Sequence, residues 1–118
     1  MTGKISILYD TIRLEEKLLI ESAKKNDIAV DMLDCKKLFL DLNEKNCLEG
    51  PVLQRCVSYY RNLHSTAALE GQGAKVVNCL NTGIFAGNKL FTHMLLQKAG
   101  VPTPDATVAF SKDSALDA

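Results

Sequence analysis

Two arginines in the sequence occupy positions from which they could recognise an anion. Arg55 follows an apolar segment that is typical of a buried strand, and Ser58 is a good N-cap for the helix expected after it. A guanidinium close to a helix N-terminus attracts a carboxylate, because both groups favour negative charge. A structural ion pair that holds a loop is an equally strong interpretation of Arg55.

The other arginine, Arg13, opens a charged run at the start of a predicted helix. A cation is disfavoured at that end of a helix, so an anionic ligand or partner would explain its presence. Glu15, Glu16 and Lys17 complete the run. The simpler interpretation of the run is a solvated helix face whose acidic residues lie favourably near the positive helix end.

Cysteine and histidine offer less chemistry. The chain has four unevenly spaced cysteines without a C-x-x-C pair: Cys35, Cys47, Cys56 and Cys79. We expect them to be reduced and mostly buried as small hydrophobic residues, and only Cys56, just after a predicted strand, stands where a nucleophile could. His64 and His93 have no partner at metal-ligand spacing, so we expect both at the surface or half-buried.

Familiar nucleotide and phosphorylation motifs are missing. The first strand-to-helix turn reads Asp10-Thr11-Ile12-Arg13, without the G-x-G-x-x-G of a dinucleotide-binding fold, and the sequence has no P-loop. A phospho-receiver domain would need a phosphorylatable aspartate after the third strand, where this chain has Arg55-Cys56-Val57-Ser58.

Composition and charge narrow the function further. The 118 residues include 14 Lys+Arg and 14 Asp+Glu, a balance that excludes a strongly basic nucleic-acid binder. No segment approaches the ~20 apolar residues that span a bilayer, and the N-terminus lacks the apolar core of a signal peptide. We therefore expect a cytoplasmic protein without nucleic-acid or membrane partners.

The elements that must position these residues alternate between strand and helix. Strands are predicted at residues 4–9, 28–33, 51–57, 74–78 and 107–110. Helices are predicted at residues 13–26, 58–70, 81–100 (broken near Gly83 and Gly87) and from 111 onward. In the first helix, Leu14, Leu18, Leu19 and Ala23 form the expected apolar face. Segment 37–42 is compatible with an edge strand or a hairpin.

This alternation predicts an α/β fold, a Rossmann-like three-layer sandwich with a mostly parallel sheet between helices. Ligands bind such sheets beyond the carboxyl ends of the strands. The rule selects three places as candidate binding sites: Tyr9 and Asp10, the segment from Arg55 to Ser58, and Asn78.

The C-terminal third carries a more specific pattern. Gly87-Asn88-Lys89-Leu90 precedes a predicted helix that ends in Gln97-Lys98-Ala99-Gly100-Val101-Pro102-Thr103-Pro104. This arrangement resembles the junction of ATP-grasp ligases, in which G-D-K opens a helix ending in A-G-V-P-x-P. The α/β segment upstream is similar to the pre-ATP-grasp domain of that superfamily.

Further blocks resemble the LysX/RimK-like branch of the superfamily. The stretch from Ile7 to Lys17 is similar to LYDxIRxEEK, Gln54-Arg55-Cys56-Val57-Ser58 is similar to ERCVS, and Val76-Val77-Asn78 forms a third block. The resemblance implies a pre-ATP-grasp α/β domain at 1–86, a helix and linker at 87–104, and the start of an ATP-grasp domain at 105–118.

The resemblance also implies a reaction. LysX-type enzymes use ATP and Mg²⁺ to join the α-amino group of 2-aminoadipate to the C-terminal glutamate of the small acidic carrier protein LysW, and close variants use glutamate. By this resemblance Lys89 approaches ATP, and the candidates for binding substrate or carrier are Tyr9, Asp10, Arg13, Arg55, Ser58 and Asn78. The chain departs from the pattern at Asn88, where Asp is usual, and at Gln54, where Glu is usual.

The catalytic groups and Mg²⁺ ligands of ATP-grasp enzymes are expected beyond residue 118, so we expect no catalytic or metal-binding residue here and no ligation by these residues alone. The full-length protein is expected to form a homo-oligomer. Three alternatives remain: a RimK-type ligase that adds glutamate to a protein or cofactor, a non-catalytic α/β module that docks a carrier protein or a subunit, and a degenerate fragment without activity.

Overall fold

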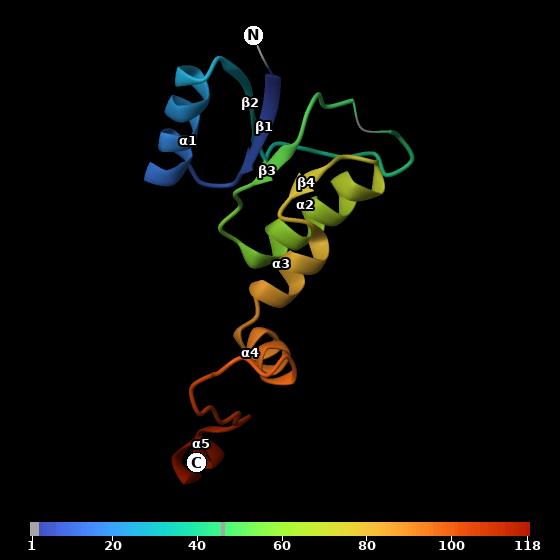
Figure 1. The fold of residues 1–118 in the computed structure, drawn as a ribbon. Coiled ribbons are helices and arrows are strands. Elements are labelled where there is room, and N and C mark those ends of the chain that lie inside the picture. Colours follow the sequence, from blue (N-terminus) through green and yellow to red (C-terminus); the bar gives the residue numbers. More distant parts are fainter. Residues whose placement is uncertain (1–2, 46) are drawn as a thin grey trace. The chain divides into compact units, whose positions relative to one another are not determined.

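The chain folds into two units that divide between Gly87 and Asn88. The structure is a computed structural model that describes residues 3–45 and 47–118, and Figure 1 shows the course of the chain. No helix in these described ranges is long and apolar enough to cross a membrane.

The first unit is built on a parallel sheet. Its four strands are β1 (Gly3–Tyr9), β2 (Ile28–Asp34), β3 (Val52–Gln54) and β4 (Val76–Val77). They lie in the order β2-β1-β3-β4, and every neighbouring pair is parallel. The predicted α/β fold is confirmed, although β3 and β4 are shorter than the sequence indicated.

Three helices accompany the sheet: α1 (Leu14–Lys25), α2 (Tyr59–Gly71) and α3 (Leu80–Ala86). In this sheet β2 lies on one side of β1, and β3 and β4 lie on the other side. Right-handed crossovers in opposite directions place their helices on opposite faces. Accordingly, α1 lies on one side of the sheet and α2 and α3 on the other (Figure 1).

The core lies between the sheet and α2. Leu8, Val52 and Val76 from three neighbouring strands meet Leu69 of α2, and each is at most 5% exposed. Ile7, fully buried, points to the opposite face because side chains alternate along a strand. Strand β1 is therefore covered on both faces, as its run of apolar residues requires.

The predicted edge strand or hairpin at 37–42 is wrong. Between β2 and β3 the described residues form turns and irregular chain. The Asp34 carboxylate accepts a hydrogen bond from the backbone N–H of Lys36 (3.0 Å), and that of Asp41 accepts one from Asn43 (2.9 Å). Such short side-chain bonds bend the backbone into turns and compete with strand pairing.

Helices α2 and α3 pack closely together. Tyr59 Oη donates a hydrogen bond to the carbonyl oxygen of Ile84 (3.0 Å), and a Cβ at Gly87 would collide with the Tyr59 ring. Gly83 lies inside α3 and does not break it, so the predicted break at Gly83 is wrong. The helical pattern is interrupted at Gly87, the C-cap of α3.

The second unit contains α4 (Lys89–Lys98) and α5 (Lys112–Asp117). Gly100 adopts a φ of 71° just after α4, in the left-handed region that glycine tolerates best, as expected for the end of that helix. The strand predicted at 107–110 is not formed. A strand requires a neighbour for its backbone hydrogen bonds, and the described part of the chain pairs no strand with this segment.

Candidate functional site

The carboxyl ends of β1 and β3 form the switch point of the sheet. The chain leaves β1 toward β2 on one side, and β3 lies against β1 on the other. In open parallel sheets, helices that depart to opposite faces generally leave a crevice at such a point, and ligands bind there. The segments that meet at this point are Asp10 to Arg13 and Arg55 to Ser58. The sequence selected Asp10 and the segment from Arg55 to Ser58 for this edge, and Arg13 separately as a cation at a helix start.

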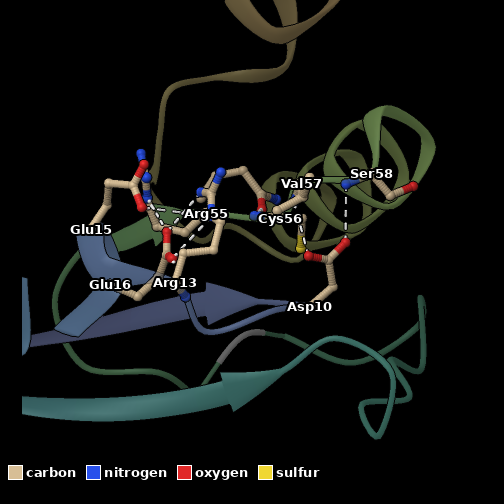
Figure 2. Close-up of polar contacts among 9 residues, drawn as sticks. Asp10, Arg13, Glu15, Glu16, Arg55, Cys56, Val57 and Ser58 are labelled. Carbon is tan, nitrogen blue, oxygen red and sulfur yellow. Dashed lines mark hydrogen bonds and ion pairs between the residues drawn. The ribbon is translucent and has the colours of Figure 1, made fainter.

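Asp10 joins these two segments. Its side chain is buried, and its carboxylate accepts hydrogen bonds from the backbone N–H groups of Val57 (2.9 Å) and Ser58 (3.0 Å) (Figure 2). Arg61 Nη1 lies 3.6 Å from the same carboxylate. Burial alone would raise the Asp10 pKa, but these hydrogen bonds and Arg61 outweigh it and hold the pKa below its ordinary value. Asp10 thus fixes the loop that starts α2.

Glu16 is the unexpected centre of the site. Its side chain is fully buried, and it accepts hydrogen bonds from the backbone N–H of Arg13 (2.9 Å), from Arg13 Nε (3.2 Å) and Nη2 (2.9 Å), and from Arg55 Nε (2.9 Å). Figure 2 shows both arginines converging on this carboxylate. The solvated-face interpretation holds for Glu15 and Lys17, which are exposed, but is wrong for Glu16.

Arg13 and Arg55 therefore contact the same carboxylate, a meeting that the sequence analysis did not predict, and Glu16 was not among its candidate site residues. The expected apolar face of α1 is also wrong in part, because Leu14 is 67% and Leu18 is 53% exposed. Glu16 and Ala23 are the buried residues of α1. Their separation of seven residues is two helical turns, so this spacing was the signal that could have identified Glu16.

Acid should weaken the fold through Glu16. Its hydrogen bonds from Arg13 outweigh the effect of burial and, with Arg55, lower the Glu16 pKa from 4.5 to about 2. Because the Glu16 pKa is lower in the folded state than in the unfolded state, the ionised carboxylate stabilises the fold fully at pH values above about 4.5. This stabilisation is lost as the pH falls toward about 2. We expect a loss of about 2 to 3 kcal/mol in the free energy of unfolding.

Urea unfolding across this pH range would measure that loss. Glu16→Gln removes the titrating group, so its free energy of unfolding should start lower and vary less with pH. Glu21→Gln, an exposed position on the same helix, should follow the wild type. A Glu16→Gln profile as steep as that of the wild type would contradict the assignment.

The remaining candidates of the first unit lie along the same sheet edge. Tyr9 ends β1, is half-buried, and accepts a hydrogen bond at its carbonyl oxygen from the N–H of Cys35 (2.7 Å). Ser58 is the N-cap of α2, where its hydroxyl accepts from Arg61 N (3.3 Å), as the sequence predicted. Asn78 is exposed after β4 and lines a pocket of ≈ 380 Å³.

That pocket brings in residues that the sequence analysis did not propose as ligands. Gln54, Tyr59, Asn62 and Thr82 contribute to its wall together with Asn78. The amide and hydroxyl side chains of this pocket are neutral, in contrast to the charged Arg13, Glu16 and Arg55 on the α1 side of the sheet. Gln54, the last residue of β3, therefore lines the pocket on the α2 side of the sheet, whereas the next residue, Arg55, contacts Glu16 of α1.

The hydrogen bonds of Gln54 give a physical reason for glutamine at the position where the resemblance to ERCVS predicts glutamate. The two N–H groups of its amide are shared among three acceptors, Ser65 Oγ (2.9 Å), Thr66 Oγ1 (2.9 Å) and the carbonyl oxygen of Asn62 (3.2 Å), and its amide oxygen accepts from Cys56 N (3.0 Å). A glutamate could not donate to the Asn62 carbonyl. The amide therefore ties the end of β3 to α2.

The cysteines are free thiols among the described residues, but they are not mostly buried: Cys56 is buried, Cys35 is half-buried, and Cys47 and Cys79 are exposed. Burial, with Cys35 nearby, raises the Cys56 pKa to about 12. A thiol that stays protonated is a poor nucleophile, so that interpretation of Cys56 is not supported.

The histidines follow the prediction, with His64 exposed and His93 half-buried. Within residues 3–45 and 47–118, no group of three or more His, Cys, Asp or Glu side chains could hold a metal ion. No residue of the described chain is therefore assigned to Mg²⁺.

Lys89 belongs to the second unit, where it is the exposed first residue of α4. The preceding Asn88 caps this helix, since its side-chain oxygen accepts a hydrogen bond from Phe91 N (3.1 Å). Lys89 also lines a pocket of ≈ 370 Å³ with His93, Met94 and Gln97. A lysine at a helix N-terminus can offer a positive charge to a phosphate, so the residues present fit one contact with ATP.

Comparison with known proteins gives this geometry a context. A family model described as the LysX preATP-grasp domain matches residues 5–84. The chain is 35% identical to the alpha-aminoadipate–LysW ligase LysX of Sulfurisphaera tokodaii, over 96% of this chain and 41% of the relative. It is 30% identical to the glutamate–LysW ligase ArgX of Sulfolobus acidocaldarius, over 98% of this chain and 41% of the relative.

A solved structure supports the fold. The crystal structure of a RimK domain protein ATP-grasp from Sphaerobacter thermophilus superposes with a TM-score of 0.75, covers 97% of this chain and 44% of that protein, and is 23% identical. The chain spans about two fifths of the length of the relatives that it matches. With its parallel sheet and the matched segment 5–84, the chain belongs to the LysX preATP-grasp domain family.

Proposed function

We propose that this chain is the N-terminal part of an ATP-dependent ligase that joins the α-amino group of 2-aminoadipate or glutamate to the C-terminal glutamate of the carrier protein LysW. The family match over residues 5–84 carries this proposal. Similarity to two LysW ligases over nearly the whole chain supports it, because one acts on α-aminoadipate and the other on glutamate.

The chemistry proposed for the whole protein divides between this chain and the remainder. ATP would phosphorylate the carrier carboxylate, and the amino group would attack the resulting acyl phosphate. Phosphoryl transfer needs cations around the transferring group. We propose that Lys89 supplies one of them to ATP and that the Mg²⁺ ligands lie outside these 118 residues.

The switch point is the proposed contact with substrate or carrier. Arg13 and Arg55 present positive charge there, Tyr9 and Ser58 border it, and Asn78 lies farther along the sheet edge after β4. Asp10 is proposed to act through the loop that it holds, because its carboxylate is buried against Val57 and Ser58. The domain division proposed for the parent protein is 1–86, 87–104 and 105–118.

Release of ADP by the full-length protein tests the proposal. We expect release that requires LysW together with 2-aminoadipate or glutamate, and none from residues 1–118 alone. Full-length protein that releases no ADP with either amino acid would contradict the ligase assignment. Carrier binding without any nucleotide turnover would instead favour the docking-module alternative, and glutamate transfer to another protein would favour a RimK-type activity.

The role of Lys89 has a matched control in the same helix. Lys89→Gln should raise the KM for ATP about tenfold, the effect expected from losing one charged hydrogen bond. Lys98, at the other end of α4, is also exposed, and Lys98→Gln should leave that KM unchanged. Equal effects of the two substitutions would remove the specific role from Lys89.

A further inference from the structure

The Arg13–Glu16–Arg55 cluster contains two guanidinium groups but only one buried carboxylate, so it carries excess positive charge. Glu16 is fully buried, whereas the Arg13 and Arg55 side chains are 38% and 33% exposed. A single guanidinium can neutralise and chelate one carboxylate. The more exposed Glu15 approaches Arg13 only at 4.0 Å, where solvent screens the interaction.

Hydrogen bonds to Glu16 leave donors on both arginines. A guanidinium carries five N–H groups in a rigid planar fork. Among the described residues, the bonds to Glu16 use Nε and Nη2 of Arg13 and only Nε of Arg55. Both side chains keep a solvent-accessible part, so donors remain available at the rim of the cluster.

The location of the cluster gives these donors a direction. Arg55 directly follows β3, and its backbone N–H donates to the carbonyl oxygen of Leu8 in β1 (2.7 Å). Arg13 ends the loop that leaves β1. The two arginines thus flank the switch point of the sheet, where a bound ligand would meet both. Arg13 also stands at a helix N-terminus, where a cation costs stability unless an anion compensates it.

We propose that Glu16 is a positioning residue that holds Arg13 and Arg55 side by side so that their remaining N–H groups bind a carboxylate of a substrate. The identity of that substrate rests on the proposed function: it is either the amino acid or the acidic carrier. The fixed fork favours a planar, bidentate carboxylate, and the bonds from Glu16 keep both guanidinium groups from rearranging when the site is empty.

Kinetics of the full-length protein separate positioning from mere structural support. Glu16→Gln keeps the shape of the side chain but removes its charge and lets the arginines move. We expect its KM to rise about tenfold for one substrate, with kcat changed less than twofold. The rise in KM for the amino acid or for LysW identifies which carboxylate is bound. Glu21→Gln should change neither KM.

Conservative replacement of the arginine gives a second measurement. Arg55→Lys retains the charge but not the planar fork, so it should raise the same KM as Glu16→Gln, and Arg55→Ala should raise it further. Folded Glu16→Gln and Arg55→Ala proteins with wild-type KM values for both substrates would overturn the proposal. The cluster would then hold only the loop.

Spectroscopy of the wild-type protein tests the cluster even if Glu16→Gln does not fold. The Arg13 and Arg55 Nε–H signals in ¹⁵N NMR, assigned with Arg13→Lys and Arg55→Lys, should shift saturably when glutarate is added. Sodium chloride at equal ionic strength should leave them in place. Equal responses to chloride, or to inorganic phosphate, would overturn selective carboxylate binding.

These measurements also distinguish the two proposals. Absence of ADP release with either amino acid would defeat the proposed function, while a saturable glutarate response would still support the arginine cluster. Normal LysW-dependent ADP release with no glutarate response and unchanged KM values in Glu16→Gln would defeat only the role of the cluster.

Discussion

Asp10→Asn is expected to lower the free energy of unfolding by about 2 to 4 kcal/mol, because it leaves a backbone donor without an acceptor and removes the anion that faces Arg61. The wild-type carboxylate accepts from Val57 N and Ser58 N with its two oxygens and lies 3.6 Å from Arg61 Nη1. Asparagine has one acceptor oxygen, so its NH₂ group would face the second backbone N–H. Neither donor can turn away, because both belong to the backbone at the start of α2.

Asp31→Asn is the matched control for this substitution. Asp31 also pairs with a cation, Lys4 at 3.0 Å, but its side chain is 44% exposed. An exposed pair contributes less than about 1 kcal/mol. Chemical denaturation of the two variants would measure the difference, and equal losses at the two positions would show that burial of Asp10 does not matter.

Gly50→Ala is expected to be the most damaging single-methyl addition, with a loss of about 3 kcal/mol or a failure to fold. Gly50 has a φ of 73°, and a Cβ there would collide with the backbone carbonyl of Lys4. The obstacle is main chain in β1, which cannot rotate away as a flexible side chain could. Gly50 precedes Pro51, whose carbonyl oxygen accepts from Ser6 N (3.0 Å), so any displacement reaches the sheet.

Two other glycines separate the two causes. Gly73 has a φ of 90° with open space around its Cβ direction, so Gly73→Ala isolates the backbone cost, about 1 to 2 kcal/mol. Gly3 has neither positive φ nor a neighbour within 4 Å, so Gly3→Ala should change stability by less than about 0.5 kcal/mol. If Gly50→Ala and Gly73→Ala cost the same, close approach to Lys4 contributes nothing.

The alternation of strands and helices could be predicted because it depends on local patterns. Leu8 and its apolar neighbours require a buried strand whatever follows them, and Ser58 caps a helix through bonds within its own turn. The carboxyl-edge rule then placed Tyr9 and Asp10 near the segment from Arg55 to Ser58. That inference needs only the strand order and its parallel direction.

The partnership with Glu16 could not be derived in the same way. A glutamate in a helix is normally assigned to the solvent-facing side. Leu14 and Leu18 were therefore expected on the buried face of α1, although both are exposed and Glu16 is buried. Burial of Glu16 depends on an arginine 39 residues away, which only the assembled sheet brings within reach. A buried carboxylate is affordable only with such partners.

The strand or hairpin predicted at 37–42 is wrong because local interactions, rather than distant partners, decide the structure there. The segment after β2 contains alternating apolar residues that favour a strand, yet Asp34 and Asp41 capture backbone N–H groups and turn the chain. Leu38 and Leu40 still pack partly against the core. These apolar side chains are thus partly buried although the segment forms no strand hydrogen bonds. The spacing of apolar residues alone does not distinguish this arrangement from a strand.

Adjacent positions at the boundary of the two units are restricted by different forces, which bears on how the family can vary there. At residue 87 the ring of Tyr59 excludes volume, so glycine has no substitute. At residue 88 the requirement is one oxygen able to accept from Phe91 N, a role that aspartate fills as well as asparagine. Aspartate and asparagine at residue 88 are therefore nearly equivalent for the start of α4, whereas a side chain at residue 87 would displace Tyr59.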